Sequence, residues 1–245
     1  MSTIRSSIDI ALDALEAGVT NAHPRSVIGS SVMIDDGMLR VGDEVVDLAA
    51  HNRVLVFGGG NAVGRVAAAL YECLGDRIDD GIIVTDDPAS AGPIEMRERT
   101  HPLPSQPNVA GTRKLLEYAC ATDEDTLALV PVTGGGSALL TAPSGEIELD
   151  DMVALTESLL RSGAPISTIN TVRRAVSDVE GGKLAEKLAP ATTVGLVFSD
   201  VTSDDPAVVA SGPLSPTPTT TADALNVLEE YNGSVESLDS VGIGR

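Results

Sequence analysis

Two glycine runs in this 245-residue sequence have the residue types of anion-binding turns. They consist of Gly58, Gly59 and Gly60, and of Gly134, Gly135, Gly136 and Ser137. Each run follows an apolar stretch, and the accessible backbone amides of glycine can surround a phosphate or carboxylate where a helix then begins. The runs therefore predict an anion site, although a tight turn that needs glycine for close backbone approach would contain the same residues.

Neither run matches the common nucleotide-binding motifs. The second lacks the lysine of a Walker loop, which excludes a P-loop NTPase. The first, in FGGGNAVG, has the spacing G-x-G-x-x-x-G and departs from the dinucleotide fingerprint. Glycine spacing alone therefore leaves the identity of the anion open.

Acidic residues follow a later apolar stretch. Asp200, Asp204 and Asp205 all lie in the segment SDVTSDDP. Because proteins usually hold Mg²⁺ with one or two carboxylates together with substrate phosphates, Asp200 and Asp204 are the candidate metal ligands. Aspartate is frequent throughout this sequence, and a solvated acidic loop is the alternative interpretation.

Basic residues gather in the segment NTVRRAVSDVEGGKLA, although the sequence has only three lysines. Arg173, Arg174 and Lys183, with the nearby Asn170, are candidates for binding a carboxylate or phosphate. The planar guanidinium fork matches the geometry of both groups. Ion pairing with the many acidic residues is the alternative.

The pattern of apolar residues predicts the elements that position these segments. Strands are expected at residues 53–57, 81–85, 127–132 and 193–198, and helices at residues 62–74, 109–120, 148–162, 168–176, 182–188 and 222–231, with a proline-rich loop at residues 88–108. This alternation predicts an α/β fold, a doubly wound, mostly parallel Rossmann-like sheet with helices on both faces. Ligands bind such sheets at the carboxyl ends of the strands, where the two glycine runs and the aspartates lie.

The sequence divides into three parts. Residues 1–50 predict an N-terminal helix, with apolar residues at helical spacing, and a β-hairpin that turns at Asp36 and Gly37. Residues 51–231 predict the Rossmann-like domain. Residues 232–245 have little to bury and predict a frayed tail.

Charge excludes several classes of function. The sequence has 36 acidic and 16 basic residues and a formal net charge of −20, which repels phosphate and excludes a general nucleic-acid binder. It also argues against docking on anionic membranes, and the sequence has no apolar run of about 18 residues that would predict a membrane span.

The composition also indicates a location. A lysine-poor, aspartate-rich surface is expected of a halophilic protein in concentrated salt, although an ordinary acidic protein would show the same balance. Asp9, Asp13 and Glu16 would interrupt the apolar core of a secretory signal. A salt-rich cytoplasm is therefore the predicted location.

Taken in order, several segments resemble the glycerate 2-kinase family. They are RVLVFGGG, HPLPSQPNVAGTRKLLE, TGGGSALL, LLRSGAPISTINTVRRAVS, EGGKLA and SDVTSDDPAVVASGP, and the resemblance runs from about residue 4 to about residue 231. It implies phosphoryl transfer from ATP, the co-substrate, to the 2-hydroxyl of D-glycerate, giving 2-phosphoglycerate, with Mg²⁺ as the metal ion. With this composition, a haloarchaeal member of the family is expected. Some members carry the older name hydroxypyruvate reductase, so an NAD(P)-dependent reductase is the alternative.

The resemblance implies roles for individual residues. Gly134–Ser137 would cradle an anionic group, and Arg173 would clamp a carboxylate or phosphate. Asp200 would either hold Mg²⁺ or orient the attacking hydroxyl. The expected catalytic positions are Asn61, Arg173 and Asp200, and the expected binding set also includes Gly58–Gly60, Asn170 and Lys183.

The sequence departs from the family pattern at several positions. Asn61 stands where the family usually has lysine, Ala175 where it often has histidine, and Ser203 where it often has glycine. A C-terminal domain closes the family's cleft, and we expect this chain to lack that domain. We therefore expect phosphorylation to need that domain, which a separate partner chain would supply. A fragment, a split enzyme and a non-catalytic anion-binding paralogue remain the open alternatives.

Overall fold

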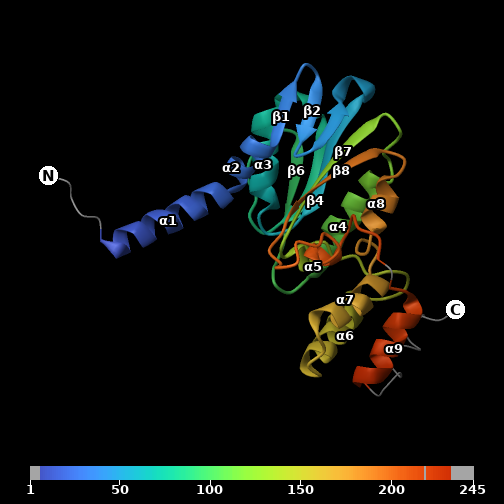
Figure 1. Cartoon of the computed structure of the whole chain (residues 1–245). Helices are drawn as coiled ribbons and strands as arrows, with labels where there is room; N and C mark the ends of the chain where they lie inside the picture. The colour runs from blue at the N-terminus through green and yellow to red at the C-terminus, as the bar shows by residue number, and fades with distance from the viewer. Residues whose placement is uncertain (1–5, 218, 233–245) are drawn as a thin grey trace.

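A five-stranded parallel sheet forms the centre of the protein in the computed structural model, which describes residues 6–217 and 219–232 (Figure 1). Its strands are β4 (Arg53–Gly59), β5 (Asp80–Thr85), β6 (Ile94–Glu98), β7 (Thr126–Thr133) and β8 (Thr192–Phe198). They lie in the order β6-β5-β4-β7-β8, and every neighbouring pair is parallel. The strand order therefore reverses between β4 and β7, the switch point at which open α/β sheets bind ligands.

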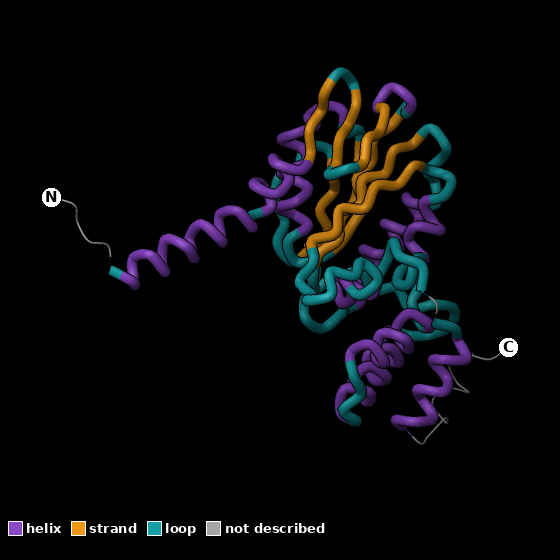
Figure 2. Tube along the Cα trace, viewed as in Figure 1, coloured by secondary structure: helices purple, strands orange, loops and turns teal. Residues whose placement is uncertain are grey.

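Helices cover both faces of this sheet (Figure 2). They are α3 (Val63–Leu74) on one face, and α4 (Gln106–Ala119), α5 (Gly136–Leu139) and α8 (Lys183–Leu188) on the other. Successive residues of β4 alternate between the two faces, so Val54 and Val56 pack toward α3 while Leu55 and Phe57 pack toward α4. Burial on both faces explains the continuous apolar runs, and it confirms the predicted doubly wound α/β fold.

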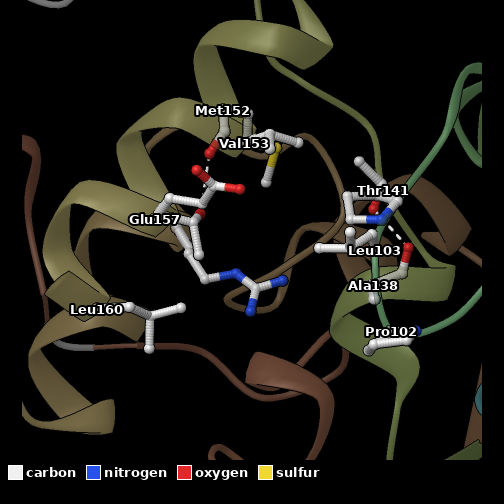
Figure 3. Close-up of a pocket in the computed structure, with 11 residues that line it drawn as sticks. Pro102, Leu103, Ala138, Thr141, Met152, Val153, Glu157 and Leu160 are labelled. Atoms are coloured by element: carbon white, nitrogen blue, oxygen red, sulfur yellow. Dashed lines mark hydrogen bonds between the residues drawn. The ribbon is translucent and has the colours of Figure 1, made fainter.

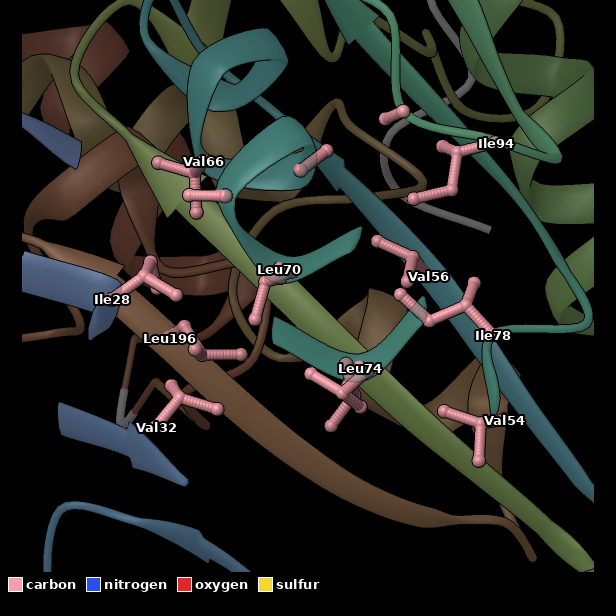
Figure 4. Packing of buried hydrophobic residues seen from close by; sticks show 14 of the residues in the cluster. Ile28, Val32, Val54, Val56, Val66, Leu70, Leu74, Ile78, Ile94 and Leu196 are labelled. Carbon is pink, nitrogen blue, oxygen red and sulfur yellow. The ribbon is translucent and has the colours of Figure 1, made fainter. Parts of the chain in front are cut away.

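The core on the α3 face also holds the N-terminal part of the chain in place (Figure 4). Leu70 and Leu74 of α3 are buried with Ile28 of α2 (Pro24–Ser31) and Val32 of β1 (Val32–Asp35). Strand β1 pairs antiparallel with β2 (Met38–Val41), which confirms the predicted hairpin. The structure adds a third antiparallel strand, β3 (Glu44–Asp47), and a short 3-10 turn η1 (Leu48–Ala50), neither of which the sequence pattern predicted.

The first helix, α1 (Ser7–Ala22), begins with a capping box between Ser6 and Asp9 and projects away from the rest of the protein (Figure 1). Its apolar residues follow the predicted helical spacing, yet none of them is buried. Leu12 and Leu15 are 58% and 64% exposed. Among the described residues, no helix has both the length and the apolar composition that a membrane span requires.

Three further helices form a separate layer below the carboxyl ends of the strands (Figures 1 and 2). They are α6 (Leu149–Arg161), α7 (Ile166–Ala175) and α9 (Thr221–Asn232), and all three lie where the sequence predicted helices. Leu159, Ile169 and Leu228 form the buried contact between them. The layer brings α7, which carries the two adjacent arginines, close to the end of the sheet.

The prediction of a continuous loop at residues 88–108 is wrong, because β6 lies within it. Within the described part of the chain, this edge strand pairs only with β5, so its sequence IEMRE can leave Glu95 and Glu98 exposed and does not form an apolar run. The helix predicted from residue 109 begins earlier, at Gln106. The predicted boundaries at residues 50 and 231 stay predictions, and residues 233–245 of the predicted frayed tail lie outside the described residues.

Candidate anion-binding site

The two glycine turns meet at the switch point of the sheet. The amide of Asn61, just after the first turn, donates a hydrogen bond of 2.9 Å to the carbonyl of Gly134 in the second. The next amide, that of Ala62, donates to Oγ1 of Thr133 at 3.2 Å. The carboxyl ends of β4 and β7 are therefore joined directly through their turns, as the sequence predicted.

Glycine is required in the second turn because neighbouring groups already occupy the space of a side chain. A Cβ added to Gly135, whose φ is +78°, would lie 2.0 Å from Oδ1 of Asn61. A Cβ added to Gly134 would lie 2.0 Å from Oδ2 of Asp200. Both gaps are far shorter than a van der Waals contact, so the structure places Asn61 and Asp200 directly against the second turn.

The oxygen atoms at this point suit a hard cation. Oδ1 of Asn61 is buried and has no hydrogen-bond partner among the described residues. The exposed carboxylate of Asp200 lies against the adjoining glycine. Amide and carboxylate oxygens are ligands that Mg²⁺ accepts, and it usually completes its shell with water and substrate phosphates. These two residues therefore fit a magnesium ion that arrives with a phosphate ligand.

Asp204, the second predicted metal ligand, is not joined to the turns in the same way. Its backbone is left-handed, with φ of 48°, and its amide donates to the carbonyl of Val201 at 3.2 Å. No hydrogen bond or ion pair within residues 6–217 and 219–232 links its side chain to the glycine turns. The described residues also contain no group of three or more His, Cys, Asp or Glu side chains placed to hold a metal.

Arg173 holds the end of the second glycine turn through a hydrogen bond to its backbone. Its Nη2 donates a hydrogen bond of 2.7 Å to the carbonyl of Ser137, and its side chain is 17% exposed. The contact neutralises part of the carbonyl dipole and leaves the positive charge of the guanidinium beside the turn. The structure thus places Arg173 at the predicted anion site, where it braces the backbone.

Asn170 reaches the same turn through a second serine. The hydroxyl of Ser211 donates to Oδ1 of Asn170 at 3.2 Å and lies 2.9 Å from the hydroxyl of Ser137. Asn170 and Ser211 are both buried. Asn170 therefore acts on the turn through Ser211, which sequence analysis did not single out as a site residue.

The segment around Ser211 is strained as well as buried. Ala210 and Ser211 have φ of 50° and 59°, a left-handed conformation that is costly for residues with a Cβ. Their turn, in the short 3-10 helix η3 (Val209–Ser211), packs so closely on the second glycine turn that a Cβ on Gly136 would lie 2.5 Å from that of Ala210. The motif ASGP was the available sequence signal for this part of the site.

Glu180 is a further site residue that sequence analysis missed. Its carboxylate is buried, lies 3.5 Å from Nη2 of Arg173, and neither of its oxygens has a hydrogen-bond partner among the described residues. Burial raises the pKa of Glu180 to about 7, against the opposing effect of Arg173, Arg174 and Lys183. Its place in EGGKLA, between the arginines and the lysine, was the signal in the sequence.

Lys183 is not brought to the glycine turns. Its Nζ donates 2.7 Å to the carbonyl of Arg174 and also donates to the carbonyl of Ser177, so it ties the start of α8 to the end of α7. Burial lowers the pKa of Lys183. The predicted role in phosphate binding therefore has no support in the geometry, and the lysine holds two helices together.

The first glycine run has a packing role in addition to its place at the site. A Cβ on Gly58 would lie 2.1 Å from the carbonyl oxygen of Pro131, and one on Gly60 would lie 2.2 Å from Oγ1 of Thr133. A Cβ on Gly59 would lie 2.4 Å from the side chain of Leu140. These glycines permit β4 to approach β7 and α5 closely, which supports the close-packing interpretation, and the anion-binding interpretation of this run stays a prediction.

Comparisons with known proteins identify relatives along most of the chain. A family model described as "Domain of unknown function (DUF4147)" matches residues 10–241. The D-glycerate 2-kinase of Thermotoga maritima is 42% identical over 193 residues, which are 78% of this chain and 46% of the relative. A putative hydroxypyruvate reductase of Agrobacterium vitis is 40% identical over 181 residues, which are 73% of this chain and 41% of the relative.

A solved structure matches the whole fold. The crystal structure of the glycerate kinase from Thermotoga maritima superposes with a TM-score of 0.81 at 33% identity. The match covers 96% of this chain and 54% of the solved chain. This chain therefore spans about half the length of the relatives that it matches.

Proposed function

This chain belongs to the DUF4147 family, and from that premise we propose that it carries the phosphate-binding half of a glycerate kinase. The reaction would transfer the γ-phosphoryl group of ATP to the 2-hydroxyl of D-glycerate and yield 2-phosphoglycerate. The observation that carries the proposal is the meeting of two glycine turns with Asp200 at the switch point of the sheet. The match to the D-glycerate 2-kinase supports it.

Each residue at this point has a role in the proposal. Phosphoryl transfer depends on positioning the phosphates and on neutralising their charge. The amides of Gly134–Ser137 would hold phosphate oxygens, and Arg173 would keep the turn in shape while adding positive charge. Asp200 would hold Mg²⁺ or orient the glycerate hydroxyl. When bound, Mg²⁺ would offset the negative charge of the phosphate groups.

Asn61 lowers the phosphoryl-transfer rate that we propose for this chain. A lysine at this position would offer a cation to the transferred phosphoryl group, whereas the Asn61 amide offers a neutral oxygen. Losing one charge-stabilising group of this kind costs roughly 10²–10³ in rate. We therefore propose that this chain transfers phosphoryl groups slowly. If the missing positive charge abolishes transfer altogether, the chain is a phosphate-binding protein without catalytic activity.

The second half of the relatives' length has a place in the proposed reaction. The carboxylate of Asp200 is exposed, and Gly134, Gly135 and Ser137 are half-buried, so a phosphate bound there would still contact water. Phosphoryl transfer needs water excluded and the hydroxyl held in line. We propose that a domain equivalent to the relatives' other half covers the site during turnover, and that a separate chain could supply it.

The proposed setting is a salt-rich cytoplasm, as in a haloarchaeal cell. The net charge of −20 would cause self-repulsion in dilute buffer, and concentrated salt would screen it.

The experiment compares two glycine variants by calorimetry. Gly135→Ala places its methyl group against Asn61, whereas Gly163→Ala has open space around it and almost the same φ, +77° against +78°. The backbone strain is therefore matched. With Mg²⁺ and ATP in multimolar KCl, we expect Gly135→Ala to bind about tenfold more weakly than the wild type and Gly163→Ala to bind equally well.

The same titrations separate the alternatives. Equal ATP affinity in both folded variants would place the phosphate site elsewhere. Tight NADPH binding together with reduction of hydroxypyruvate would favour the activity in the name of the Agrobacterium vitis relative. Formation of 2-phosphoglycerate from ATP and D-glycerate by this chain, with and without the second half of a relative, measures how far the chain acts alone.

A further inference from the structure

A second feature lies directly beside the phosphate-binding turn, a cavity of about 260 Å³ (Figure 3). It opens between the loop that contains Leu103 and the helix α6, which contributes Met152, Val153 and Leu160. None of these residues has a role in holding phosphate. The cavity is smaller than most sites for drug-sized ligands, which range over roughly 300–1,000 Å³, and suits a single flat ring system.

Two residues connect this cavity to the phosphate-binding turn. Ala138 lines the cavity and directly follows Ser137. Arg173 also lines it, while its Nη2 donates to the carbonyl of Ser137. A ligand in the cavity therefore lies next to the end of the turn, and one molecule could occupy both places.

The walls of the cavity are mostly apolar, and its mouth exposes large apolar side chains. Leu103 is 65% exposed and Leu160 is 59% exposed. Apolar side chains at a concave opening are typical of ligand sites, because the ligand removes them from water. Glycerate is small and carries a polar group on every carbon, so it would gain little here.

The polar side chains that line the cavity are those of Thr141, Thr156 and Arg173, together with Glu157, whose carboxylate accepts a hydrogen bond from Arg161. Thr141 donates its hydroxyl proton to the carbonyl of Ala138 at 2.7 Å, and Thr156 donates to that of Met152 at 2.9 Å. Each hydroxyl is left with lone pairs that can only accept. The cavity therefore suits a ring that presents an amino group, as adenine does.

We propose that this cavity binds the adenine ring of a nucleotide whose phosphates occupy the turn at Gly134–Ser137. The inference rests on the proposed function, since it assigns the base end of the same ATP molecule. It predicts that the two ends of the nucleotide bind in separable places, the phosphates on the glycine turn and the base between Leu103 and α6.

The test uses separate probes for the two ends, adenosine and inorganic triphosphate with Mg²⁺, measured by calorimetry in multimolar KCl. Val153→Trp fills the cavity, and Ala154→Trp adds the same indole to the exposed side of α6 as a matched control. We expect Val153→Trp to weaken adenosine and ATP about tenfold and to leave triphosphate unchanged. Gly135→Ala should do the reverse, weakening triphosphate and sparing adenosine.

Leu160→Ala is a milder variant, because this side chain is already largely exposed and its removal leaves the fold intact. It should weaken adenosine by about threefold, from the loss of one apolar contact. Unchanged adenosine affinity in folded Val153→Trp and Leu160→Ala, or ATP binding no tighter than triphosphate, would overturn the assignment.

The remaining outcomes distinguish the two proposals. Adenosine binding that Val153→Trp abolishes, with no binding of triphosphate, would support the adenine site and contradict the phosphate-binding function. Triphosphate binding that Gly135→Ala abolishes, with no binding of adenosine, would support the function and overturn the adenine site. A wild-type protein that binds neither probe would contradict both.

Discussion

Glu180 shows how one buried residue affects the charge at this site. Its carboxyl is buried beside Arg173 and accepts no hydrogen bond from any residue that the structure describes, and Arg173 in turn donates to the carbonyl of Ser137. Ionising such a group inside the protein costs free energy that the neighbouring cations only partly offset. The charge of Glu180 therefore depends on pH within the physiological range.

Glu180 should make the free energy of unfolding depend measurably on pH. The pKa of Glu180 is about 7 in the folded protein, against an ordinary value of 4.5. Between these values only the folded state keeps the proton, so the Glu180 contribution to the free energy of unfolding falls as pH rises from 4.5 to 7. Glu180→Gln cannot ionise and should gain about 3 kcal/mol relative to the wild type over that window.

Urea unfolding of both proteins at several pH values between 5 and 8.5 measures this difference. A difference that stays constant across the range would mean that Glu180 is already ionised at pH 5 in the folded protein.

Residue-level chemistry could be predicted from the sequence only in part. The glycine turns and Asp200 were found because parallel strands bring their carboxyl ends to one edge. The contacts of Lys183 and Glu180 were not, because both lie in one short segment whose side chains diverge, one toward backbone carbonyls and the other toward Arg173. Spacing in the sequence does not determine which way a side chain turns within an irregular segment.

Among the elements, α1 and α3 are contrasting amphipathic helices. Both have apolar residues at helical spacing, but Leu70 of α3 is fully buried whereas Leu12 of α1 is 58% exposed. An isolated helix of 16 residues is marginal in water, so α1 depends on its cap and its own hydrogen bonds.

This contrast predicts different costs for the same substitution. Leu70→Ala should lower the free energy of unfolding by about 2–5 kcal/mol, because it opens a cavity in the core. Leu12→Ala should change it by less than about 0.5 kcal/mol, because that side chain is largely exposed. Urea denaturation gives both values. If Leu12→Ala proves as costly as Leu70→Ala, then α1 is covered in solution.

Elements were predicted well where burial is two-sided and poorly where it is one-sided. Strands β4 and β7 are buried on both faces and appear in the sequence as continuous apolar runs. Strand β6 lies at the edge, and β3 belongs to a small antiparallel sheet that is largely exposed. Both segments are short, carry charged residues and lack an apolar run, so they look like loop, and each becomes a strand only by pairing with the strand before it, β3 with β2 and β6 with β5.

At the scale of the whole molecule, charge is the dominant property. Ion pairs such as Arg25–Glu72 and Arg161–Glu157 lie at the surface and contribute little each. They also cannot balance 36 acidic residues with 16 basic ones. Repulsion among the remaining carboxylates therefore outweighs the attraction within the pairs.

Salt should consequently stabilise the folded protein. Raising KCl from about 0.1 M to 1 M shortens the screening length from roughly 10 Å to 3 Å and removes most of this repulsion. A gain of about 2 kcal/mol corresponds to a rise in Tm of roughly 4–8 °C for a chain of this size. Thermal melts across a KCl series test this. A Tm that is flat or falls with KCl would show that the carboxylates are spaced too widely to repel.

The contact between Asn61 and Gly135 couples the substitutions that these two positions can accept during evolution. Because the amide oxygen of Asn61 occupies the space where a side chain at position 135 would begin, the two positions form an epistatic pair. A side chain at position 135 would clash less beside a smaller residue at 61, although the φ of +78° would keep it strained. Directed evolution of this site should therefore randomise the two codons together, because the clash of a side chain at 135 is relieved only by a change at 61.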